Sequence, residues 1–102
     1  MRKVVLALLF LTSSAAAQTV LAGDVGAGQS AFASKGCIGC HGSAGKNPTG
    51  ENPVIGGKSA EFITAELIKF RSGERTDPLM NAMTASLSDA DIANLAAYLS
   101  SQ

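Results

Sequence analysis

The stretch from residue 37 to residue 58 limits most strongly what this chain of 102 residues can fold into. It contains six Gly, two Pro and two Asn, and it shows hardly any apolar periodicity. A connection of about 20 residues without regular structure is uncommon inside a small domain unless it surrounds something. We therefore expect these residues to wrap around a bound group.

The N-terminal residues 1–22 have the pattern of a secretory signal peptide. Arg2 and Lys3 precede an apolar run at 4–11, and a small and polar stretch follows at 12–22. At about 1.5 Å per residue, the apolar run is too short to cross roughly 30 Å of hydrocarbon as a helix. An uncleaved membrane anchor is therefore the weaker interpretation.

Cleavage after Ala17 or after Ala22 would fit the small residues of this segment. We favour Ala22, because a helix start at Asp24 follows it directly. The prediction is thus a cleaved signal peptide at 1–22 and one domain at 23–102, exported to the periplasm, soluble and without an integral membrane span.

Composition excludes several classes of protein. A formal net charge of +0 and a pI near 6.5 do not provide the basic surface that nucleic-acid binding requires. Cys37, Cys40 and His41 are all the Cys and His of the chain, one ligand short of a four-ligand zinc site. The chain has no Trp and few other aromatic residues, so its core would be small for a domain of this length. We expect a bound group to fill part of the interior.

Apolar periodicity and capping residues predict an all-α fold with three main helices, at about 24–34, 59–71 and 88–99. The last is the clearest, because Ser88 and Asp91 form a capping pattern before an apolar stripe at Ile92, Leu95, Ala96 and Leu99. Alternating β-branched runs that would indicate a sheet are lacking in the sequence.

Gly28 is unfavourable inside the first of these helices unless another backbone comes close to it. It lies one turn before Phe32, so the last helix could cross there through Leu95 and Tyr98. A frayed first turn is the alternative explanation.

Cys37-Ile38-Gly39-Cys40-His41 is the C-x-x-C-H pattern of c-type haem attachment. Two thiols three positions apart can reach the two vinyl groups of one porphyrin and form thioethers, and the next residue, His41, then becomes the proximal iron ligand. A disulfide between the two Cys would close too short a loop to stabilise much. A thioredoxin-like dithiol would need a sheet that the sequence does not predict.

A second iron ligand has to come from the rest of the domain. Met80 and Met83 are the Met residues left after processing, in the polar and proline-led segment 77–83 between the middle and last helices. A Met usually fills gaps in a core, but this segment is an unusual place for two core residues. One iron ligand and one packing Met is the simplest account.

In these residues the sequence resembles the class I c-type cytochromes. More narrowly, it resembles a small bacterial monohaem cytochrome c, or one half of the tandem di-haem kind. The resemblance covers residues 23–101 and is most specific at 37–41, at 70–75, and at Met80 followed by 87–92. It implies the class I cytochrome c fold, in which about three main helices and short helical segments surround one covalent haem.

The resemblance also assigns roles to individual residues. It places the axial Met seven residues before Leu87, which is Met80 rather than Met83, and it makes the carbonyl of Pro53 the acceptor of the His41 Nδ1–H bond. The family's Trp that binds a haem propionate is missing here, so Arg71, Arg75 or Lys58 would take that role.

The function that follows is one-electron transfer, with haem c bound through Cys37 and Cys40, iron bound by His41 and Met80, and no catalytic residues. Redox proteins that donate and accept the electron would bind transiently. Two alternatives stay open. The chain could be the haem subunit of an oxidoreductase, for instance beside a flavoprotein that oxidises sulfide, or a ligand-binding or peroxidatic haem protein if neither Met binds iron.

Overall fold

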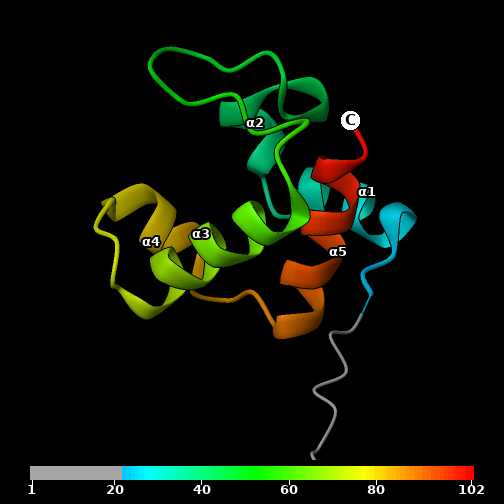
Figure 1. Ribbon diagram of the computed structural model, residues 1–102. Helices are drawn as coiled ribbons and strands as arrows, with labels where there is room; N and C mark the ends of the chain where they lie inside the picture. Colours follow the sequence, from blue (N-terminus) through cyan, green and yellow to red (C-terminus); the bar gives the residue numbers. More distant parts are fainter. Residues whose placement is uncertain (1–21) are drawn as a thin grey trace, which may run out of the picture.

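The computed structural model describes residues 22–102, so the predicted signal peptide lies outside the described residues except for Ala22. The described part is all-helical (Figure 1), and its elements follow one another along the chain as α1 (Val25–Ser34), α2 (Cys37–His41), the 3-10 helix η1 (Ser43–Gly45), α3 (Ala60–Ser72), α4 (Pro78–Thr84) and α5 (Asp89–Ser100). The all-α prediction is confirmed, and within residues 22–102 no helix is long and apolar enough to cross a membrane.

The three main helices begin where the capping residues predicted. The Asp24 side chain accepts a hydrogen bond from the Gly26 amide at the start of α1, and Ser59 does the same for α3. At the start of α5, Ser88 and Asp91 each accept from the other's backbone amide, which is a complete capping box. Local side chains therefore satisfy amides that have no partner inside the helices.

Helices α1 and α5 cross at Gly28. A Cβ atom on Gly28 would lie 1.9 Å from the Asn94 carbonyl oxygen, so the crossing requires glycine at this position. Beside it, the rings of Phe32 and Tyr98 pack with their centroids 5.6 Å apart. The predicted crossing is confirmed, and a frayed first turn is excluded because Gly28 is helical and buried.

Two short helices lie outside the three main helices, in line with the short helical segments that the family resemblance implies. Most of segment 77–83 lies in α4, where the N-cap Asp77 side chain accepts from the amides of Leu79 and Met80 and Pro78 occupies the first turn. These are helix-start signals, but seven residues are too few to show apolar periodicity. The glycine-rich stretch likewise begins with α2 and η1 before it becomes the open loop at the top of Figure 1.

A small hydrophobic core lies along α5. Its members are buried apolar side chains from α1, α3, α5 and the turn before α5, namely Phe32, Ile63, Leu87, Ile92, Leu95, Ala96, Tyr98 and Leu99. The α5 helix packs against α1 on one side and against α3 on another. This core holds α1, α3 and α5 together. Helices α2 and α4 complete the domain, and a cavity lies between these elements.

Candidate cofactor site

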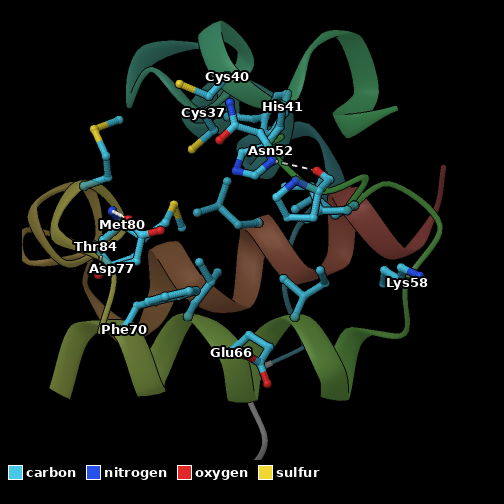
Figure 2. A pocket seen from close by; sticks show the side chains of 18 of the residues that line it. Cys37, Cys40, His41, Asn52, Lys58, Glu66, Phe70, Asp77, Met80 and Thr84 are labelled. Atoms are coloured by element: carbon cyan, nitrogen blue, oxygen red, sulfur yellow. Dashed lines mark hydrogen bonds between the residues drawn. The ribbon is translucent and has the colours of Figure 1, made fainter. Parts of the chain in front are cut away.

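The cavity has a volume of about 610 Å³ and is lined by residues from α2, α3, α4 and α5 and from the glycine-rich loop. Figure 2 shows Cys37, Cys40 and His41 on the α2 side of the cavity and Met80 on the α4 side. Phe70 and Glu66 lie on α3. Much of the rest of its surface is apolar, from residues such as Leu67, Leu95 and Leu99. The sequence motif and both candidate Met residues therefore line one cavity.

Helix α2 presents the two thiols and the imidazole together. Gly36 begins this helix with φ 82°, a left-handed conformation that favours glycine, and the five residues after it form little more than one turn. Cys37 and Cys40 are both free thiols. Desolvation by burial is the largest effect on the Cys37 thiol and raises its pKa. Two adjacent thiols on one turn suit attachment to a single planar group.

His41 is held in one orientation by the loop that follows it. The ring is buried, with 6 % of its surface exposed, and Nδ1 lies 2.9 Å from the Pro53 carbonyl oxygen. A carbonyl oxygen only accepts, so Nδ1 carries the proton, and in the neutral ring Nε2 carries the lone pair. Bonds of this kind orient metal-binding imidazoles and make them more basic.

Both candidate Met residues line the cavity from α4. Met80 is held through its backbone: its amide donates to the Asp77 side chain at 3.0 Å, and its carbonyl accepts from the Thr84 hydroxyl at 2.7 Å. The Met83 methyl group instead lies toward α2, since it is the nearest atom to a Cβ placed on Gly36. The sequence did not predict that Thr84, which is 1 % exposed, is part of this site.

The three cations considered for a propionate differ in their partners. Arg71 binds the Leu87 carbonyl and Asp89 and does not line the cavity. Arg75 lines it but donates to Glu66 at 2.5 Å, which is the main reason for the lowered pKa of that carboxyl group. Lys58 lines the cavity too, and its exposed side chain is labelled at the edge of Figure 2.

The cavity fits a large apolar cofactor that binds a metal. Three of its lining residues are large apolar side chains left exposed, Val54 at 45 %, Phe62 at 48 % and Leu79 at 57 %. Exposed apolar side chains that gather around one cavity indicate a partner that covers them. Two thiols, one oriented imidazole and the thioether sulfur of one of the two Met residues would then fit the attachment points and iron ligands of a c-type haem. Fold and site together define an all-helical domain built around one covalent haem.

Comparison with known proteins agrees with this class. The family model described as cytochrome c matches residues 25–102. The chain therefore belongs to the cytochrome c family, a family of electron-transfer proteins, and carries one covalent c-type haem through Cys37 and Cys40. The resemblance seen in the sequence is confirmed.

Among curated relatives, cytochrome c4 of Pseudomonas aeruginosa is 34 % identical over 102 residues, which are 100 % of this chain and 49 % of the relative. Cytochrome c-554(548) of Halomonas halodenitrificans is 38 % identical over 84 residues, 79 % of this chain and 99 % of the relative. The cytochrome subunit of sulfide dehydrogenase from Chlorobaculum tepidum is 39 % identical over 62 residues, 61 % of this chain and 56 % of the relative.

A solved structure of Acidithiobacillus ferrooxidans cytochrome c4 superimposes with a TM-score of 0.65 and 29 % identity, covering 74 % of this chain and 50 % of that one. This similarity confirms the class I fold. The chain thus spans about half the length of both cytochromes c4 and nearly all of the Halomonas protein.

Proposed function

We propose that this protein is a one-electron carrier in which His41 and Met80 would both bind the haem iron. The observation that carries the proposal is that the two thiols, the oriented His41 ring and Met80 all line one cavity of about 610 Å³. The haem supplies a reversible ferric–ferrous couple when bound. The side chains around the haem determine whether that couple serves electron transfer.

Each of these residues has a separate task in the proposal. Cys37 and Cys40 hold the cofactor, and Pro53 keeps Nε2 of His41 available as a ligand. The thioether sulfur of Met80 favours ferrous iron relative to a second imidazole, and the apolar lining disfavours the ferric charge. If His41 and Met80 both bind the iron, they would leave no position open for a small ligand, which favours electron exchange over ligand binding.

The proposal includes export. The charged start, short apolar run and small residues of 1–22 support removal of that segment after Ala22 and a periplasmic domain at 23–102. Intact mass of the purified protein, combined with haem staining of a denaturing gel, tests both processing and covalent attachment. A colourless protein, or one that retains residues 1–22, would contradict this part of the proposal.

Separate Met80→Ala and Met83→Ala variants test the ligand. Binding of a Met sulfur to ferric iron gives an absorption band in the far red. We expect Met80→Ala to lose this band and Met83→Ala to keep it. The opposite result would move the ligand to Met83. Rapid binding of carbon monoxide to the reduced wild-type protein would show an open position and would favour a ligand-binding haem protein.

A second candidate function is that of the electron-transfer subunit of an oxidoreductase. It is favoured by the similarity to the cytochrome subunit of sulfide dehydrogenase, reported above. A flavoprotein would then be a permanent partner. Purification from the native cells distinguishes the two functions, because a subunit elutes with its partner in fixed stoichiometry and a free carrier elutes alone.

A further inference from the structure

Helix α4 is too short to hold its position alone. Isolated helices below about 12 residues are marginal in water, and α4 has seven, with Leu79 at its start 57 % exposed. Yet α4 carries Met80, whose sulfur has to meet a metal at a fixed place. Contacts outside the helix must therefore set its position.

The side chain of Asn81 makes three such contacts. Its Nδ2 donates to the Phe70 carbonyl at 2.8 Å and to the Arg75 carbonyl at 2.9 Å, and its Oδ1 accepts from the Asp77 amide at 2.9 Å. One residue thus joins the last turn of α3, the connection after it and the N-cap of α4. Both amide hydrogens and the amide oxygen have partners, so the side chain is locked in one orientation.

These bonds connect α4 to a part of the fold that is itself well anchored. Phe70 is buried at the end of α3, and α3 packs against α5 and the core. Asn81 directly follows Met80, so a shift of Asn81 moves Met80 with it. The Arg75 guanidinium lies over the Phe70 ring, 4.7 Å from its centroid, and so adds a contact at the same end of α3.

We propose that Asn81 is a positioning residue that docks α4 onto α3 and so fixes Met80 as an iron ligand. The inference rests on the proposed function, in which Met80 binds the iron. Loss of the Asn81 contacts then raises the fraction of molecules in which α4 has moved away from the iron. An external ligand competes more successfully for iron in those molecules.

Titration of the ferric holoprotein with imidazole measures that competition. Loss of the two Asn81 donor bonds in Asn81→Ala should tighten imidazole binding by about tenfold to a hundredfold. Asn81→Asp keeps the size of the side chain and the oxygen that accepts from Asp77, but has no amide hydrogens at neutral pH. It should tighten binding as well, and it carries the test if Asn81→Ala does not fold.

Asn94→Ala is the matched control. The Asn94 side chain also accepts one backbone hydrogen bond, from Asp24 at 2.8 Å, but it lies on α5 beside α1 and away from α4. We expect this variant to bind imidazole with wild-type affinity even if it is less stable. An equal increase in Asn94→Ala would show that general destabilisation explains the effect and would overturn the inference.

The inference and the proposed function fail in different ways. Wild-type imidazole affinity in folded Asn81→Ala or Asn81→Asp, together with loss of the far-red band in Met80→Ala, would overturn the role of Asn81 and leave the ligand assignment intact. Retention of the far-red band in Met80→Ala would instead overturn the ligand assignment. Circular dichroism of each variant shows that the comparison is made between folded proteins.

Discussion

The Nδ1 atom of His41 lies 2.9 Å from the carbonyl oxygen of Pro53, twelve residues further along the chain. The ring comes from a short helix and the carbonyl from an otherwise open loop. If His41 binds the iron as proposed, the bond makes the conformation of the glycine-rich loop part of the environment of the iron. A change in the loop that leaves every ligand in place is expected to alter the redox couple.

Pro53→Ala tests this relationship, because the variant keeps the carbonyl but frees the backbone that presents it. We expect a loss of about 0.5–1 kcal/mol in the free energy of unfolding. We also expect a higher reduction potential, since a weaker bond makes the imidazole less basic and stabilises ferric iron less. Denaturant unfolding and a redox titration measure the two effects. Pro48→Ala, in the same loop, is the control, and an equal shift of potential in both variants would contradict the prediction.

Gly28→Ala should disrupt the crossing of α1 and α5. The added Cβ would lie 1.9 Å from the Asn94 carbonyl oxygen and 2.7 Å from the Tyr98 Cβ, so the helices must separate. Overpacking of this kind costs about 1–3 kcal/mol. In Gly26→Ala, on the same helix, the added Cβ would have no neighbouring atom closer than 3.7 Å. This variant should raise the free energy of unfolding by about 0.5–1 kcal/mol. Thermal unfolding checks both, and equal stability of the two variants would count against the close approach.

Asp91 should contribute to stability in a way that depends on pH. Its carboxylate accepts from the Ser88 amide at 3.0 Å, and this bond is the main cause of a pKa below the ordinary value of 3.8, with Lys35 adding a smaller effect. A carboxyl group with a lowered pKa in the folded state stabilises the fold above its unfolded-state pKa. That contribution is lost as the pH falls through the folded-state pKa.

In Asp91→Asn the side chain does not titrate. We expect a loss of about 0.3–1 kcal/mol at neutral pH, because the negative charge at the start of α5 is removed, and a shallower fall in stability below about pH 4. Denaturant midpoints measured between neutral and acid pH test this. Glu51→Gln, which leaves the capping box intact, is the control, and parallel curves for wild type and Asp91→Asn would refute the assignment.

The rate of electron transfer should depend only weakly on ionic strength. Residues 23–102 carry six basic and eight acidic side chains, so the domain has a small net negative charge. Strong electrostatic steering raises association rates by roughly 10- to 1000-fold, and we expect less than about tenfold here. Rates with one anionic and one cationic inorganic oxidant, measured from low to physiological ionic strength, provide the test. A larger change would indicate that the charges are gathered on one face.

The sequence predicted the parts of the fold that depend on local patterns. Ser59 and Ser88 mark the starts of α3 and α5, and Gly28 indicates the crossing, because each of these signals lies within one or two helical turns. Short helical segments were expected from the family resemblance, but the position of α4 was not predicted because this helix shows no periodicity. The bonds of Asn81 and Arg75 to Phe70 and Glu66 were missed too, since they depend on how α4 and the connection after α3 lie against α3.

The candidate site was predictable to a similar extent. The motif at Cys37, Cys40 and His41 is contiguous, so its chemistry can be inferred before the fold is known. The bond from His41 to Pro53 came from the family resemblance, because spacing alone does not indicate which loop carbonyl faces a ring. The choice between Met80 and Met83 also needed the resemblance, since both side chains line the cavity.

The cavity has a consequence for biogenesis. A polypeptide whose interior is completed by its cofactor gains part of its stability only when that cofactor is in place. Synthesis of the chain and supply of porphyrin are therefore coupled at the level of folding. Cells that make the polypeptide faster than they attach the pigment should accumulate degradation products rather than a pool of stable, uncoloured protein.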